Sequence, residues 1–133
     1  MHPLYPKASG LTKTIIGAAI EVHRDKGPGL VESIYEWYLQ CELDLRGLPS
    51  TRQRTVQIHY KQFTREESLR FDLLVADCVL IEIKAVESIL PIHKAQLLSY
   101  MHLLDVPLGL VINFNTLRLT SGVARMMLPQ ANQ

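Results

Sequence analysis

Three charged side chains interrupt the apolar sequence between Phe71 and Lys84, and this pattern constrains the fold more than any other. The segment reads Phe-Asp-Leu-Leu-Val-Ala-Asp-Cys-Val-Leu-Ile-Glu-Ile-Lys, with Asp72 in the first apolar run and Glu82 and Lys84 in the second. Apolar runs joined by a short polar break are typical of a β-hairpin. A charge inside such a strand is costly unless it is paired or binds a metal. The segment therefore predicts a hairpin built around an ion pair or a metal site.

Composition places the chain among globular proteins. It has 133 residues, of which 47% are hydrophobic and 20% charged, which suits one domain with a real core. The net charge of +1 provides no overall field for nucleic acid, so phosphate binding has to come from a local cluster or a metal. Cys41 and Cys78 form no spacing motif, and without a signal peptide they predict a cytoplasmic protein. No run approaches the ~18 apolar residues of a membrane span, so no membrane partner is expected.

Periodicity predicts the order of the elements. Apolar residues three and four apart predict helices over 11–26, 31–46 and 91–104. Strands are expected over 53–60, 68–75, 78–85 and 108–114, with a polar turn at 61–67 and an edge strand or hairpin within 117–127. The third helix is expected to pack on the sheet through Ile92, Ala95, Leu98, Met101 and Leu104. Residues 1–10 are expected to be a flexible arm, 11–128 a single domain and 129–133 a frayed tail. This order predicts an α/β sandwich with a mixed sheet flanked by helices.

The loop of the hairpin decides which charges meet. A two-residue loop, Ala76-Asp77, would place Asp72 and Glu82 on opposite faces of the sheet. A three-residue loop that includes Cys78, or a bulge, would bring the two carboxylates across from each other. A metal site requires this second register.

In that register the hairpin offers oxygen ligands to a hard cation. Asp72, Glu82 and the backbone carbonyl of Ile83 would suit Mg²⁺ or Mn²⁺, which prefer oxygen and keep several waters. Lys84 shares a face with Glu82 and would lie near a metal-bound water. The alternative is a structural ion pair between Lys84 and one of the two carboxylates.

Two helices carry polar residues that would face such a site. Glu32 lies in the first turn of the second helix, where a carboxylate also complements the helix dipole, and Tyr35 is expected to be a packing residue. On the third helix Gln96 and Tyr100 are four residues apart and share a face, with His93 one turn earlier. A place at the boundary between solvent and core remains the alternative for these residues.

Together these residues resemble the PD-(D/E)XK nuclease superfamily, and more closely its small GxxExxY proteins. The residues that carry the resemblance are Gly29, Glu32 and Tyr35 of the GxxExxY motif, Asp72 and Glu82-Ile83-Lys84 of the superfamily signature, and Gln96 with Tyr100 of the Gln-xxx-Tyr motif. The resemblance runs from about Thr12 to Arg125, and Phe71 stands where the superfamily name has Pro.

The resemblance implies a restriction-endonuclease-like α-β-β-β-α-β core with an extra N-terminal helix. It also implies a nuclease that hydrolyses phosphodiester bonds, expected to be those of DNA, with water activated by Mg²⁺ or Mn²⁺. Asp72, Glu82 and the Ile83 carbonyl would hold the metal. The catalytic residues would be Lys84, Glu32, Gln96 and Tyr100.

Basic residues around the first two strands are candidate phosphate contacts, with a solvated face as the ordinary alternative. They are Arg52, Arg54, Lys61, Arg65 and Arg70, joined by Lys94 and His93 on the third helix. A non-catalytic module that binds nucleic acid or protein is the main rival to a nuclease, and a structural protein that dimerises through its final strands is another. A domain this small has little room for a specificity element, so a homodimer or a partner protein is expected.

Overall fold

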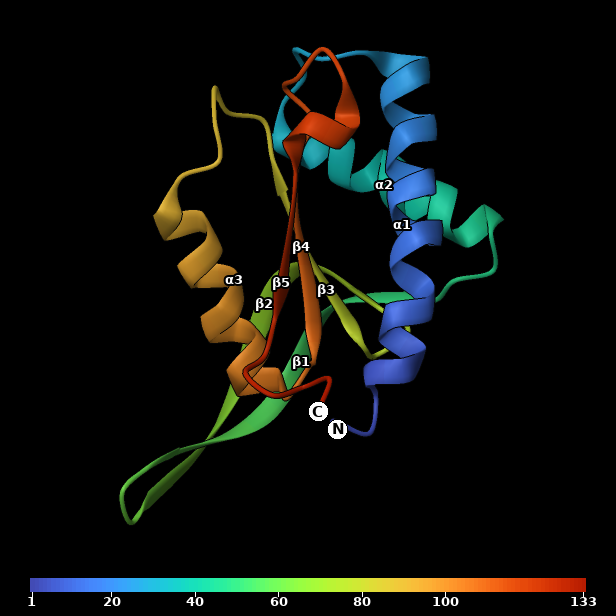
Figure 1. The fold of residues 1–133 in the computed structure, drawn as a ribbon. Helices are drawn as coiled ribbons and strands as arrows, with labels where there is room; N and C mark the ends of the chain where they lie inside the picture. Colours follow the sequence, from blue (N-terminus) through green and yellow to red (C-terminus); the bar gives the residue numbers. More distant parts are fainter.

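The computed structural model describes all 133 residues and shows a five-stranded sheet between two layers of helices (Figure 1). The elements are α1 (Tyr5–Lys26), α2 (Glu32–Leu45), β1 (Ser50–Tyr60), β2 (Phe63–Val75), β3 (Val79–Lys84), α3 (Pro91–Leu104), β4 (Leu108–Asn113), a short 3-10 helix η1 (Leu119–Gly122) and β5 (Val123–Met127). The strand order is β1-β2-β3-β4-β5, and only β3 and β4 run parallel. The mixed sheet and the extra N-terminal helix confirm the expected fold class. None of the helices has the length and apolar character needed to cross a membrane.

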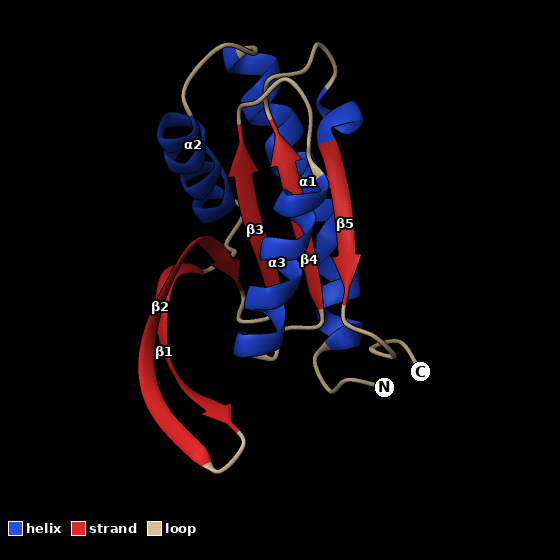
Figure 2. Ribbon diagram, turned by 90° about the vertical axis from the view of Figure 1, so that its left-hand side faces the viewer, coloured by secondary structure: helices blue, strands red, loops and turns tan.

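Helices cover both faces of the central strands. Successive residues of β3 point to opposite faces, so Ile81 joins the core beneath α1 and α2 whereas Leu80 joins the core beneath α3. All six residues of β4 are buried, as expected for a parallel strand covered on both sides. Figure 2 shows β3, β4 and β5 enclosed by the helices while β1 and β2 leave this layer.

α3 packs on the sheet through a stripe that matches the expected one at Leu98, Met101 and Leu104 but not at Ile92 and Ala95. Leu97, Met101 and Leu104 are buried, whereas Ile92 is exposed. Ala95 is exposed too, and Leu98 is half-buried. The lack of a side chain at Gly109 of β4 explains why Leu97 and Met101 face the sheet. A Cβ there would lie 2.7 Å from the Met101 sulfur and 3.1 Å from a Leu97 methyl group. The missing side chain lets this stripe approach the strand.

Both chain ends pack against the rest of the structure, which differs from the expected flexible arm at 1–10 and frayed tail at 129–133. Residues 5–10 form the first turns of α1, where Pro6 is tolerated because the first helical N–H groups have no partner within the helix. Ala8 is fully buried, and Ala131 is 3% exposed. The His2 N–H donates to the Ala131 carbonyl at 2.8 Å, which ties the two ends together.

The expected polar turn at 61–67 is also wrong. β1 and β2 continue pairing up to Tyr60 and Phe63, leaving only Lys61 and Gln62 as the loop. The alternation expected for 53–60 therefore extends into 63–70, and the two segments pair as one long hairpin. We call residues 53–70 the arm. It projects away from the rest of the molecule (Figures 1 and 2).

Candidate functional site

The hairpin between β2 and β3 has the register that the charged residues require. Val75 pairs with Val79, and the Cys78 N–H donates to the Val75 carbonyl at 3.0 Å. The hydrogen bond closes a turn around Ala76 and Asp77. Cys78 adds a third residue to the loop, so the pairing is shifted by one residue from that of a two-residue loop. As a result Asp72 and Glu82 point to the same face, which confirms the expected register.

Asp72 lies where β2 separates from β3. In chain order, Leu73 is the first residue of β2 that pairs with β3, and Asp72 directly precedes it. The pairing with β1 also shifts here, since two steps along β1 correspond to four along β2. Such a bulge bends a strand and redirects its side chains. Asp72 Oδ2 accepts a hydrogen bond from the Ile83 N–H at 2.6 Å, which replaces a bond to the backbone of β2.

The Ile83 carbonyl faces the same gap. Within a strand, the N–H and C=O of one residue point to the same side, and those of the next residue point to the other. The Ile83 N–H bonds to Asp72, and the Lys84 carbonyl accepts from the Phe114 N–H on the opposite side at 2.9 Å. The Ile83 carbonyl oxygen is thus directed toward the side where Asp72 lies.

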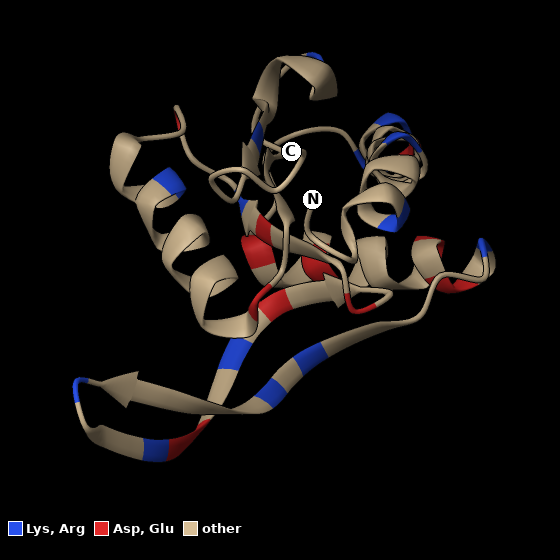
Figure 3. Ribbon diagram, turned by 60° about the horizontal axis from the view of Figure 1, so that its bottom comes forward, with Lys and Arg blue, Asp and Glu red and all other residues tan.

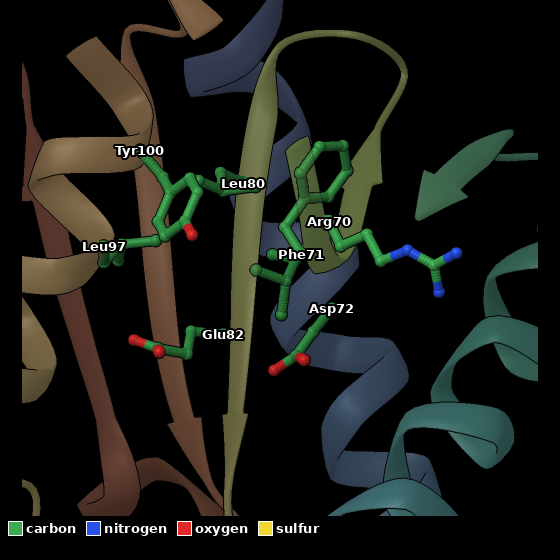
Figure 4. Close-up of a pocket in the computed structure, with 8 residues that line it drawn as sticks. Arg70, Phe71, Asp72, Leu80, Glu82, Leu97 and Tyr100 are labelled. Atoms are coloured by element: carbon green, nitrogen blue, oxygen red, sulfur yellow. The ribbon is translucent and has the colours of Figure 1, made fainter. Parts of the chain in front are cut away.

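A cavity of about 150 Å³ opens between β2, β3 and α3. Figure 4 shows Asp72 and Glu82 toward one end of it, Tyr100 and Leu97 reaching in from α3, and Arg70 turned away from Glu82. The lining residues are Arg70, Phe71, Asp72, Leu80, Ile81, Glu82, Leu97 and Tyr100. The structure therefore brings two expected metal ligands together with the expected tyrosine.

The two carboxylates are only partly compensated. Lys84 Nζ lies 3.7 Å from Glu82 Oε1, so the ion pair of the structural alternative is present. Glu82 Oε2, however, is buried and has no hydrogen-bond partner. Burial raises the pKa of Glu82, against the lowering effect of Lys84. Burial likewise raises the pKa of Asp72, opposed by the Ile83 N–H and then by Lys84.

α2 adds two carboxylates from the other side. Glu32 Oε2 accepts a hydrogen bond from the Ala85 N–H at 3.1 Å, and its charge acts on both Asp72 and Glu82. Glu36, one turn later, is 9% exposed and was not expected in the site. Burial, followed by the charge of Asp72, raises the pKa of Glu36. Its position four residues after Glu32 was the available signal, because such residues share a helix face.

Arg52 partly compensates Glu36. Its guanidinium lies 2.5 Å from Glu36 Oε1, and it also acts on the pKa of Asp72, which it lowers. Arg52 sits on β1 where the register with β2 shifts. The bulge is therefore tied to α2 by an ion pair beside the site.

Tyr35 positions the loop that precedes α2, as its expected packing role requires. Its hydroxyl donates to the Gly27 carbonyl at 2.5 Å and accepts from the Leu30 N–H at 3.1 Å. Its ring is fully buried and stacks on Phe114 with centroids 4.5 Å apart. The loop that leads into α2 and Glu32 is thereby fixed to the core.

Asn113 fixes the segment after β3 and was missed by sequence reasoning. Its side chain is 2% exposed. It accepts from the Val86 N–H at 3.0 Å and donates to the Val86 carbonyl at 2.9 Å. An asparagine inside an apolar strand was the signal. These bonds hold the backbone two residues beyond Lys84.

Several expected residues do not line the cavity, and among them Glu32, Ile83 and Lys84 act directly on its carboxylates. Gln96 and Lys94 are exposed on α3 and do not line it. His93 Nδ1 accepts from the Leu90 N–H at 3.0 Å and so caps the start of α3. Arg54 forms an ion pair with a carboxylate in the β2–β3 loop.

The donors in the cavity suit a hard divalent ion. No three Asp, Glu, His or Cys side chains converge in a way that would hold a metal ion by themselves. Two carboxylates and a backbone carbonyl nevertheless match Mg²⁺, which is usually bound by one or two carboxylates and keeps several waters. The unpartnered Glu82 Oε2 is the observation that favours such an ion, since a buried oxygen without a partner is costly.

A family model and a solved structure match this chain. The family model described as "PD-(D/E)XK nuclease superfamily" matches residues 9–126. A search of curated proteins found no match. Among solved structures, the crystal structure of SSO0001 is similar, with a TM-score of 0.58 and 20% sequence identity over 93% of this chain. The match covers 63% of that chain, so this protein spans less than two thirds of its length. At this identity the likeness concerns the fold alone.

Proposed function

We propose that this chain, which belongs to the PD-(D/E)XK nuclease superfamily, is a metal-dependent nuclease that hydrolyses phosphodiester bonds of DNA. The observation that carries the proposal is the unpartnered Glu82 Oε2, buried beside Asp72 in a cavity open to substrate. The finer relation to GxxExxY proteins is part of the same proposal, and it rests on Gly29, Glu32 and Tyr35.

Asp72, Glu82 and the Ile83 carbonyl would hold Mg²⁺ or Mn²⁺. When bound there, the ion would neutralise charge on the scissile phosphate and lower the pKa of water. The Asp72 carboxylate is already held in position, because its Oδ2 accepts a hydrogen bond from the Ile83 N–H at 2.6 Å. Both carboxylates are half-buried, which reduces their hydration and raises their pKa.

Lys84 would act on the substrate. Its ammonium group lies 3.7 Å from Glu82 and is mostly buried, so it can stabilise charge that grows on the phosphate or orient the attacking water. Glu32 bonds to the N–H of the next residue and thereby positions Lys84. Tyr100 would place its hydroxyl near the substrate, and Gln96 would join it from the same face of α3.

The proposed substrate contacts are basic residues of β1, β2 and α3. Arg70 of β2 lines the cavity, whereas Arg54 lies on β1 and His93 and Lys94 lie on α3. A homodimer or a partner protein would enlarge this small contact area. A non-catalytic binding module remains the second candidate, favoured by the Lys84–Glu82 ion pair already present in the site.

Cleavage assays separate the two candidates. Plasmid and oligonucleotide DNA are incubated with Mg²⁺ or Mn²⁺ and the wild type, Lys84→Ala or Asp72→Asn. We expect each substitution to lower the rate by a factor of about 100 or more, because each removes charge stabilisation in the transition state. Lys13→Ala, an exposed lysine of α1, is the matched control. Equal rates for all four proteins, or no cleavage by any, would favour the binding module.

A further inference from the structure

We propose that the arm grips double-stranded DNA by entering its major groove. This proposal rests on the proposed nuclease function, since it names the substrate that the same site receives. The observations that carry it are the arm's length, its charge, its exposed aromatic tip and its continuity with the cavity.

The arm is long enough to reach into a duplex. Eight consecutive residue pairs join its strands, from Gln53 with Arg70 to Tyr60 with Phe63. At about 3.3 Å per residue this is a ribbon of about 23 Å. The major groove of B-form DNA is about 12 Å wide and admits a two-stranded β-ribbon. The corresponding groove of an RNA duplex is deep and narrow and excludes such a ribbon. The shape therefore favours duplex DNA.

The arm has a net positive charge, whereas the rest of the molecule has a net negative charge. It contains four Lys or Arg against two Glu, whereas the other residues contain ten Lys or Arg against eleven Asp or Glu. The arm is thus net +2 and the remainder net −1. Figure 3 shows Lys and Arg spaced along the arm and acidic residues gathered where its base meets the sheet and α2. The basic residues are Arg54, Lys61, Arg65 and Arg70. Arg54 pairs with Asp77 in the β2–β3 loop and Arg65 with Glu67 on its own strand, so Lys61 and Arg70 are the arm's cations without an ion pair. This separation directs a polyanion to the arm.

The tip presents two aromatic rings and a lysine. Tyr60 and Phe63 face each other across the loop and are 69% and 65% exposed. Lys61 has φ of 53° in the loop, and its Nζ lies 5.2 Å from the Tyr60 ring centroid. Glycine would adopt this backbone freely, so a lysine there keeps a cation at the tip despite the strain. Exposed apolar side chains flanked by a cation suit contact with bases and phosphates.

The base of the arm meets the cavity. Arg70 ends the arm and lines the cavity together with Asp72, two residues further along β2. A DNA strand bound along the arm would therefore reach the two carboxylates at the base of the arm. Figure 4 shows the Arg70 guanidinium on the far side of Asp72 from Glu82, outside the space between the carboxylates.

A truncated arm provides the test. Val56–Glu67 is replaced by Asn-Gly, which joins Thr55 to Ser68 through a favourable two-residue hairpin loop. A second variant, Tyr60→Ser/Phe63→Ser, keeps the arm and changes only exposed side chains. The control is Lys13→Ala/Arg118→Ala, two exposed cations elsewhere. All carry Lys84→Ala to prevent cleavage. Fluorescence anisotropy with Ca²⁺ measures binding to a 20-base-pair DNA duplex, its single strand and the matching RNA duplex.

We expect both arm variants to bind duplex DNA at least tenfold more weakly than the control. The truncation should also reduce the slope of log K against log salt by about 2, since Lys61 and Arg65 are lost and each phosphate contact contributes about 0.9. The single strand and the RNA duplex should bind more weakly than duplex DNA.

Three results would overturn the proposal. The first is equal duplex affinity of the truncated arm and the control. The second is binding of single-stranded DNA or duplex RNA as tight as that of duplex DNA. The third is a change of oligomeric state on truncation without loss of DNA affinity, which would assign the arm to a protein interface. Because these are binding measurements, a wild type that binds through its arm but cleaves nothing would contradict the nuclease and leave the arm supported.

Discussion

The two halves of β2 lie in different environments. Leu73, Leu74 and Val75 are fully buried between β1 and β3. Before the bulge, the strand pairs only with β1, and most of its residues from Phe63 to Arg70 are exposed. Asp72 lies at the boundary between the halves. One strand thus anchors the Asp72 carboxylate with its last residues and presents a surface to solvent with its first.

A small fold can thus hold a candidate site and an exposed surface on one strand. The bulge lets β2 leave β3, and the gap that results exposes the Ile83 N–H and carbonyl to Asp72. A regular hairpin would fill that gap with a backbone ladder. The site therefore depends on the point at which regular pairing stops.

The largest difference between the halves should be in stability. Leu73→Ala should lower the free energy of unfolding by about 2–5 kcal/mol, because it leaves a cavity in the core. Ser68→Ala, on the exposed half of the same strand, should change it by less than about 0.5 kcal/mol. Urea denaturation measures both. Similar values for the two variants would show that the halves do not differ in the way described.

Tyr35→Phe should test how firmly the core holds α2. The hydroxyl bonds to the Gly27 carbonyl and the Leu30 N–H, so its removal leaves polar groups unpaired. We expect a loss of about 1–3 kcal/mol in unfolding free energy. Cleavage should also slow, because the loop that leads to Glu32 loosens. Retained stability with slow cleavage would instead indicate a direct catalytic role for the hydroxyl.

Glu82→Gln should stabilise the metal-free protein by about 1 kcal/mol at neutral pH, since it neutralises a group whose buried Oε2 has no hydrogen-bond partner and this gain exceeds the lost ion pair with Lys84. Burial raises the pKa of Glu82 and of Asp72 in the folded state. Their contribution to stability is therefore complete below the unfolded pKa and is lost as the pH rises through the folded pKa.

Thermal unfolding in EDTA at several pH values checks this sign. The wild type should lose stability as the pH rises from acid toward neutral, and Glu82→Gln should lose less. Mg²⁺ should restore the wild type but not the variant. A wild type that gains stability over this range would contradict the raised pKa values.

The smallest expected effect concerns the tip of the arm. Lys61→Gly should raise stability by up to about 1 kcal/mol, because glycine tolerates the positive φ of 53°. The same change should weaken duplex DNA binding through the lost charge. Gln62→Gly, the neighbouring loop residue, is the control. Tighter DNA binding by Lys61→Gly would contradict the role given to the tip.

Sequence periodicity was sufficient for the fold class, whereas the register of the β2–β3 hairpin followed from the requirement that two carboxylates share a face. Alternation located β1, β2 and β3, and the need for a shared carboxylate face selected the extra residue, Cys78. The length of the arm was missed because the charged residues of 61–67 read as a turn, although they alternate in register with β1. In the stripe of α3, Leu97 was missed because its burial depends on the space above Gly109, a property of the packed structure.

The candidate site was predicted in its principal residues and missed in its support. Asp72, Glu82 and Tyr100 line one cavity as expected. Glu36 and Asn113 were missed, because their roles depend on contacts with segments remote in sequence. The bulge could not be predicted from the sequence of β2. It arises because β2 advances four residues while β1 advances two, so it depends on the pairing of both strands.

We propose above that Asp72 and Glu82 share one divalent ion. A crystal soaked in Mn²⁺ and measured at a wavelength where manganese scatters anomalously would locate that ion. We expect one anomalous peak between the two carboxylates, with the Ile83 carbonyl as a further ligand at about 2.0–2.2 Å. An empty cavity at saturating Mn²⁺, with Lys84 still paired to Glu82, would contradict it.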